Sequence, residues 1–227
     1  MRLAKSSIAH IGFSLFRSNH ITTTSMANSI QRGESSTAEL PSEPIIFCDM
    51  DGVLADFDGG IFKITGIRCE DLPMKRIWQA VSRKQDFFET LDWAPGGKLL
   101  WENIQHFRPT LLTGVPNNKT AEVGIQKANW CRQKFGCEVH HIDKAAHRPQ
   151  RHETVNGQTF QEGVINVISC WTRFKHHEVL QPGSILIDDR LKTKTAWEEA
   201  GGIFVHHTDT QQTLKVLREL GILRNSD

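Results

Sequence analysis

Five short runs of apolar residues, each leading into polar residues, constrain the fold of this chain more than any other feature of its sequence. Within each run the residues are apolar almost throughout, rather than alternately apolar and polar. Such runs are typical of strands that are buried on both faces, as in a parallel sheet covered by helices. The sequence therefore predicts a parallel sheet built from the segments 45–48, 110–113, 164–168, 184–187 and 202–205.

Stretches with the periodicity of helices lie between these predicted strands. Residues 121–135 and 99–107 carry apolar side chains at helical spacing, and a third stretch around 196–200 stops at two glycines. The last stretch opens with Thr208-x-x-Gln211, which predicts a capping box. Strands that alternate with helices predict an α/β fold, a Rossmann-like doubly wound parallel sheet.

Two segments interrupt this alternation. Residues 59–96 are mostly helical in pattern and too long for an ordinary strand-to-helix loop, which predicts a small helical cap above the sheet. The polar residues 143–163 contain a predicted tight turn at Asn156-Gly157 and suggest a hairpin. The predicted catalytic core is then formed by residues 41–58 and 97–227.

Composition limits the class of protein. The chain is 38% hydrophobic and 23% charged, as in ordinary globular proteins, and no apolar stretch reaches the roughly 18 residues of a membrane-spanning helix. Its five cysteines are an odd number without the spacing of a disulfide framework, which favours a reducing compartment. The absence of Cys-x-x-Cys argues against zinc, although several of the 11 histidines occur in pairs.

The first 40 residues differ from the rest of the chain. Residues 1–33 contain four of the 27 Lys and Arg residues and none of the 26 Asp and Glu residues, and they are rich in Ser and Thr. This pattern predicts a transit segment for the mitochondrion over residues 1–40; a plastid or cytoplasmic location and a disordered tail are the alternatives. The remaining chain has 23 basic and 26 acidic residues, a net charge of −3 that argues against strong nucleic-acid binding.

Acidic side chains follow two of the predicted strands directly. Asp49 and Asp51 come after the first strand, and Asp188 and Asp189 come at the end of the fourth. Ligands of open α/β sheets bind outside the carboxyl ends of the strands. Carboxylates that meet there repel one another unless a cation lies among them, and oxygen ligands are what Mg²⁺ prefers. The sequence therefore predicts a Mg²⁺ site at this edge.

These residues stand in motifs that resemble those of the haloacid dehalogenase (HAD) superfamily. The matching segments are Phe-Cys-Asp49-Met-Asp51-Gly-Val-Leu-Ala-Asp56, Leu-Leu-Thr113-Gly and Leu-Ile-Asp188-Asp189-Arg190, in the order of the superfamily. Within it, the chain is most similar to the 5′(3′)-deoxyribonucleotidase-like branch. The resemblance implies that the insert at 59–96 is a C1-type cap.

The resemblance also implies roles for single residues. Asp49 is expected to be the nucleophile that forms an aspartyl-phosphate, and Asp51 the general acid and base. Thr113 is expected to bind a phosphoryl oxygen, together with the backbone N–H groups around Met50, Asp51 and Gly114.

The expected ligands of Mg²⁺ come from the same motifs. They are the Asp49 carboxylate, the backbone carbonyl of Asp51 and a carboxylate of the last motif. Asp189 is expected to bind the ion directly, with Asp188 in an outer position or acting through a water molecule.

The basic residue of the remaining motif is less sharply defined. Lys175, in Trp171-Thr-Arg173-Phe-Lys175, fits the superfamily pattern best and would bridge Asp49 and the phosphoryl group. Arg173 and Lys144 are the rival residues, and a solvated helix face is the structural alternative for Lys175.

We expect a Mg²⁺-dependent phosphomonoesterase that acts on a small soluble phosphate ester, with a nucleotide as the leading substrate. The alternatives are a catalytically idle binding or scaffold domain, and a phosphatase that acts on protein or on polynucleotide ends. The oligomeric state stays open between a monomer and a dimer.

The aromatic residues of the cap are expected to pack in its core, and stacking of one of them on a base or sugar is the alternative. The histidines His206 and His207 are expected at the exposed end of the fifth strand.

Overall fold

The computed structural model describes residues 43–117, 119–145 and 163–224. The predicted transit segment and the predicted turn at Asn156-Gly157 lie outside these ranges. In the part of the chain that is described, no helix has both the length and the apolar character needed to cross a membrane.

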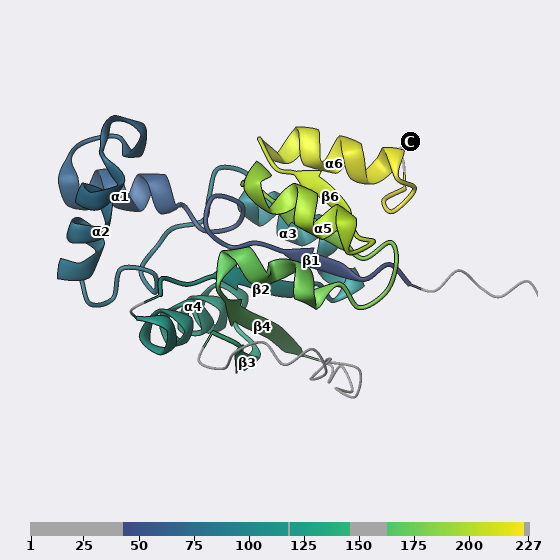
Figure 1. Cartoon of the computed structure of the whole chain (residues 1–227), viewed down its shortest axis with the longest axis horizontal. Coiled ribbons are helices and arrows are strands. Elements are labelled where there is room, and N and C mark those ends of the chain that lie inside the picture. The colour runs from purple at the N-terminus through teal and green to yellow at the C-terminus, as the bar shows by residue number, and fades with distance from the viewer. Residues whose placement is uncertain (1–42, 118, 146–162, 225–227) are drawn as a thin grey trace, which may run out of the picture. The chain divides into compact units, whose positions relative to one another are not determined.

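The core of the fold is a six-stranded sheet in which all neighbouring strands are parallel (Figure 1). The strand order is β3-β4-β2-β1-β5-β6, so β1 lies at the centre between β2 and β5. All five predicted apolar runs form strands, which confirms the predicted α/β fold. The strands are β1 (Ile46–Cys48), β2 (Thr110–Gly114), β3 (Glu138–Asp143), β4 (Val164–Cys170), β5 (Ile185–Asp188) and β6 (Ile203–His206).

Strand β3 was not predicted from the sequence. Among the described strands it lies at the edge of the sheet and pairs with β4, and its residues are alternately exposed and half-buried over its first half. The polar side chains of Glu138, His140 and His141 therefore interrupt the apolar run that marks the other strands.

Helices cover both faces of the sheet. Alternate residues of each strand point to opposite faces of the sheet. In β1, Ile46 and Cys48 belong to one apolar cluster, and Phe47 between them belongs to another. The cluster that contains Ile46 includes residues of α3, α4 and α6, whereas the Phe47 cluster includes Trp197 of α5. These helices are α3 (Gly97–Ile104), α4 (Thr120–Phe135), α5 (Lys194–Glu199) and α6 (Thr210–Glu219), with short 3-10 helices η2 (Gln105–Phe107), η3 (Thr172–Glu178) and η4 (Leu191–Thr193).

The buried face of α4 is rotated from the one that its apolar residues suggest. Ile125 is 54% exposed, whereas the polar side chains of Gln126 and Lys127 are buried beside Ala128 and Trp130. A buried lysine in this position is not visible in a pattern of apolar residues.

The insert between β1 and β2 begins with α1 (Phe57–Thr65), η1 (Cys69–Asp71) and α2 (Met74–Arg83). Figure 1 shows α1 and α2 beyond the carboxyl end of β1. Phe57 packs edge-on against Phe87, with ring centroids 5.6 Å apart, and Phe87 packs edge-on against Phe88. Phe57, Phe87 and Phe88 are thus buried in a small core, as predicted, whereas Phe62 is 53% exposed. Phe88 and the half-exposed Trp78 line the pocket that faces the sheet.

Two predictions near the C-terminus were wrong. The side chain that caps α6 belongs to Asp209, which accepts a hydrogen bond from the Gln212 N–H, so the capping residue is not Thr208. His207 is buried rather than exposed, because it turns inward and its Nδ1 lies 2.8 Å from the Thr213 hydroxyl oxygen.

Candidate active site

A tight turn after β1 places the first carboxylate at the edge of the sheet. The Asp49 N–H donates to the Ile187 carbonyl of β5, and the Met50 carbonyl then accepts from the N–H groups of residues 53–55. Gly52 has a φ of +79°, a left-handed conformation that favours glycine. The chain therefore leaves β1, turns at once and holds Asp49 over the carboxyl ends of β1 and β5.

The pairing of β1 with β5 brings the carboxylates of both strand ends together. Cys48 pairs with Ile187 in the sheet, so the next residues, Asp49 and Asp188, are neighbours as well. Ligand oxygens of Asp49, Asp188 and Asp189 all lie within 4.8 Å of one another. The structure thus brings together three of the four carboxylates that were predicted to converge, and Asp51 is not among these three.

Lys175 lies between two of these carboxylates. Its Nζ is 2.9 Å from Asp49 Oδ2 and 2.7 Å from Asp188 Oδ2, and the residue is 1% exposed. Burial alone disfavours the ammonium form, but Asp49 and Asp188 outweigh it and raise the pKa of Lys175 above its ordinary value. The lysine is therefore a fixed positive charge beside Asp49, and a solvated helix face does not describe it.

The two rivals of Lys175 lie elsewhere. The Arg173 guanidinium stacks 4.4 Å from the ring centroid of Trp171. Lys144 forms a 2.7 Å ion pair with Glu178. Neither contact joins the carboxylates at the end of β1.

Asp188 and Asp189 have different surroundings. Asp188 Oδ2 accepts from Lys175, and Asp188 Oδ1 accepts from the Arg190 N–H at 2.8 Å. Among the described residues, the buried Asp189 Oδ1 has no hydrogen-bond partner. Burial, together with the charges of Asp49 and Asp188, raises the pKa of Asp189 to about 7.

A divalent cation fits this arrangement. A buried carboxylate oxygen without a partner and a raised carboxyl pKa both show that negative charge is undercompensated at Asp189. Burial and Asp49 also raise the pKa of Asp188. Carboxylate oxygens are hard ligands, which suit Mg²⁺ better than softer metals.

Gly52 fits closely against this carboxylate cluster. A Cβ at Gly52 would lie 2.7 Å from Asp189 Oδ2, closer than side-chain atoms pack. Glycine is thus needed there both for its backbone conformation and for the close approach of Asp189.

Lys127 is one of the residues of this site that sequence reasoning missed. Its Nζ donates to Asp51 Oδ2 at 2.8 Å, to Thr113 Oγ1 at 2.7 Å and to the Gly114 carbonyl at 2.8 Å. Because α4 looks like an ordinary amphipathic helix, only the position of Lys127 beside the buried Ala128 and Cys131 could have indicated burial.

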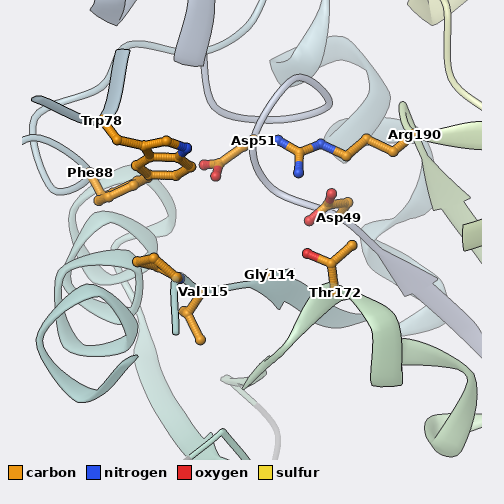
Figure 2. Close-up of a pocket in the computed structure, with 9 residues that line it drawn as sticks. Asp49, Asp51, Trp78, Phe88, Gly114, Val115, Thr172 and Arg190 are labelled. Carbon is orange, nitrogen blue, oxygen red and sulfur yellow. The ribbon is translucent and has the colours of Figure 1, made fainter. Parts of the chain in front are cut away.

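A pocket opens over Asp49 and Asp51 (Figure 2). Figure 2 shows the Arg190 side chain extending toward the two carboxylates, with Thr172 below Asp49. Thr113, the predicted phosphoryl ligand, is fully buried and is not among the lining residues. The pocket is lined by Asp49, Asp51, Trp78, Phe88, Gly114, Val115, Pro116, Thr172 and Arg190.

The predicted backbone ligands of the phosphoryl group lie in or beside this pocket. Gly114 lines it, and a side chain there would meet Thr172 Oγ1 at 2.4 Å, so Gly114 lets that hydroxyl approach. The Met50 N–H donates to Asp49 Oδ1 at 2.8 Å. Thr172 was not predicted, although it follows β4 at the carboxyl edge, where site residues are expected.

A larger cavity adjoins the pocket on the side of the cap. Its volume is about 480 Å³, and it shares Trp78, Phe88 and Pro116 with the carboxylate pocket. Cavities of roughly 300–1,000 Å³ are typical of sites for small organic ligands. The two cations at its rim are paired, Lys84 with Asp86 and Lys119 with Glu122.

No protein-family model matches the chain, and no curated protein matches it. Among solved structures, the chain is similar to a haloacid dehalogenase-like family hydrolase from Streptococcus pneumoniae. The sequence identity is 14% and the TM-score 0.33, with 80% of this chain and 100% of the other chain covered. At this TM-score the likeness carries no information about activity, so the function has to follow from the residues of the site.

Proposed function

We propose that the protein is a Mg²⁺-dependent phosphomonoesterase of the haloacid dehalogenase superfamily that acts through an aspartyl-phosphate. The observation that supports this most directly is the position of Asp49, which opens onto a pocket while its carboxylate is 2.9 Å from the buried Lys175. A carboxylate beside a fixed cation, at the carboxyl edge of a parallel sheet, suits attack on the phosphorus of an anionic ester.

In the first step, an Asp49 carboxylate oxygen attacks the phosphorus and the bond to the ester oxygen breaks. The protonated Asp51 carboxyl gives its proton to that oxygen, so the alcohol leaves as a neutral molecule. Asp49 and Asp51 line the same pocket, which allows the two groups to act on opposite sides of one phosphorus.

In the second step, water attacks the phosphorus of the aspartyl-phosphate and gives a proton to the Asp51 carboxylate. The bond between phosphorus and the Asp49 oxygen breaks, which releases inorganic phosphate and restores both side chains. The sum of the steps is hydrolysis of the ester with no other reactant.

Charge neutralisation is the main requirement of phosphoryl transfer. Lys175 supplies one positive charge at Asp49, and Arg190 extends another into the pocket. Thr172 offers a hydroxyl donor to a phosphoryl oxygen. Mg²⁺ would be held by Asp49, the Asp51 carbonyl and Asp189, with Asp188 behind them, and when bound it would neutralise charge on the phosphoryl oxygens.

The adjoining cavity suggests the size and polarity of the ester group. Apolar side chains of Trp78, Val81 and Phe88 line it, and the paired rim cations give it little net charge. A neutral, flat organic group fits such a cavity better than a second phosphate does. A nucleoside monophosphate is therefore the leading substrate, and small sugar phosphates should be hydrolysed less efficiently.

The decisive experiment measures phosphate release from an aryl phosphate by wild-type protein and by Asp49→Asn. We expect turnover in the wild type, loss of turnover in Asp49→Asn and loss in the wild type treated with EDTA, restored by Mg²⁺. The exposed Asp71→Asn serves as the control and should keep its activity. Turnover in Asp49→Asn would exclude the covalent route.

A screen of nucleotides, sugar phosphates and phospholipid headgroup esters with Mg²⁺ then tests the substrate class. If the wild type binds such esters and hydrolyses none of them, the chain is a binding module with the fold of an enzyme.

A further inference from the structure

The buried Lys127 forms a 2.8 Å ion pair with Asp51, the proposed catalytic acid. We propose that Lys127 is a positioning residue, which fixes the Asp51 carboxyl at the edge of the pocket for proton transfer, and that it does not bind phosphate. This inference rests on the proposed phosphatase activity and adds to it a residue outside the predicted motifs.

The first argument concerns the donors of Lys127. An ammonium group has three N–H donors and no acceptor. All three are used, by Asp51 Oδ2, Thr113 Oγ1 and the Gly114 carbonyl, at 2.7–2.8 Å. A lysine with every donor engaged has none left for a phosphoryl oxygen.

The second argument concerns the two oxygens of Asp51. Oδ2 accepts the hydrogen bond from Lys127, whereas the buried Oδ1 has no partner among the described residues. Among the described residues, Lys127 is thus the hydrogen-bond partner of the Asp51 carboxyl, and it sets the orientation of that side chain at the pocket.

The third argument concerns rigidity. Lys127 is 1% exposed, and its Nζ lies 5.0 Å from the centroid of the Phe88 ring. The preceding residue, Gln126, accepts a hydrogen bond from the Phe88 N–H at 3.1 Å. Adjacent residues of α4 thus fix both the catalytic acid and an aromatic residue of the pocket wall, so neither can shift without the other.

The position of Asp51 matters most when the leaving group is a poor one. An alkoxide needs a proton as it departs, whereas a dinitrophenolate does not. A residue that acts through the acid should thus affect alkyl esters far more than dinitrophenyl esters. A phosphate ligand or a purely structural residue should affect both alike.

The test compares wild type and Lys127→Met with dinitrophenyl phosphate and with an alkyl phosphate. We expect kcat/KM for the alkyl ester to fall about 100-fold or more, and the pre-steady-state burst of dinitrophenolate to keep its rate within about 5-fold. Since Asp51 also activates the water of the second step, phosphoenzyme should accumulate in the variant. Equal losses for both esters, or a raised KM for both, would overturn the proposal.

A double-variant cycle tests whether Lys127 acts through Asp51. Adding Lys127→Met to Asp51→Asn should change kcat/KM for the alkyl ester less than 3-fold, because the group that Lys127 positions is already lost. If the two substitutions instead lowered kcat/KM independently, so that their effects multiplied in the double variant, Lys127 would act elsewhere. Lys134→Met, on the same helix and outside the site, is the control and should behave as wild type.

Folding is measured for each variant by circular dichroism and thermal unfolding. If Lys127→Met does not fold because Asp51 is left unpaired, Lys127→Gln provides the same comparison of the two esters, since glutamine keeps two N–H donors and Asp51 is unchanged. A wild type without phosphatase activity refutes the proposed function, whereas an active wild type with no difference between the two esters in the variants refutes only the role of Lys127.

Discussion

The Nζ of Lys175 lies 2.9 Å from Oδ2 of Asp49, and both side chains are buried. The lysine comes from η3, after β4, and the aspartate from the turn after β1, so more than 120 residues of chain separate them. The same Nζ also contacts Asp188 of β5. One cation thus balances two carboxylates, and Oδ1 of a third, Asp189, has no hydrogen-bond partner among the described residues.

Replacing Lys175 should impair both activity and stability. In Lys175→Met, two buried carboxylates lose their common partner, and removal of one member of a buried ion pair costs about 3–5 kcal/mol. We also expect kcat/KM to fall about 100- to 1,000-fold, measured with an aryl phosphate. Arg173→Met is the matched control and should remain active, because Arg173 contacts Trp171 and Phe174. If Arg173→Met lost activity and Lys175→Met remained active, Arg173 would be the basic residue of the motif.

Mg²⁺ should stabilise the folded protein through Asp189. Binding to the folded state alone adds about 2.7 kcal/mol to the free energy of unfolding at 100 times Kd. We expect thermal unfolding of the wild type to shift upward with Mg²⁺, and the shift to vanish in Asp189→Asn. In Asp188→Asn the shift should be smaller than in the wild type but present. Equal shifts in the wild type and in Asp189→Asn would show that Asp189 is not a ligand.

Gly52→Ala should disturb the metal site beyond its effect on the backbone. An alanine in the left-handed conformation costs about 1–2 kcal/mol, and here its Cβ would also displace the Asp189 carboxylate. We expect weaker Mg²⁺ binding and at least a 10-fold lower kcat/KM. Gly66→Ala has a similar φ of +70° and open space around it, so it should lose stability without losing activity. If the two variants lose activity equally, the contact with Asp189 is irrelevant.

His207 should make the protein sensitive to acid. Burial lowers the pKa of His207 below its ordinary value of about 6.5. The unfolded chain therefore binds a proton more readily, so the stabilisation is present above about pH 6.5 and is lost as the pH falls through the lower, folded pKa. His207→Asn should show a shallower loss of unfolding free energy below pH 6.5 than the wild type, in denaturant titrations. The exposed His106→Gln should keep the wild-type slope; identical slopes for all three proteins would contradict the prediction.

The carboxylates of the site could be located from the sequence because each follows a buried strand. Continuous apolar runs identify such strands, and the carboxyl ends of parallel strands meet at one edge. Asp49, Asp188 and Asp189 were therefore predicted together, before their distances were known. Strand β3 lacked that signal, since it lies at the edge of the described sheet and carries the polar residues Glu138, His140 and His141.

The roles of the lysines depended on tertiary structure. Lys175, Arg173 and Lys144 were rivals in the sequence, and only the tertiary structure put Lys175 between the carboxylates of Asp49 and Asp188. The partners of Lys127 could not be predicted from local sequence, because Asp51 and Gly114 lie 76 and 13 residues away and belong to other elements.

The sequence by itself thus determined the sheet, its direction and the edge at which acidic groups gather, since these follow from local patterns of apolar and polar residues. The tertiary structure decided which cations are buried among those groups and which carboxylate oxygens remain unpaired. Ion pairing and burial depend on distances between segments far apart in the chain, and no local pattern contains such distances.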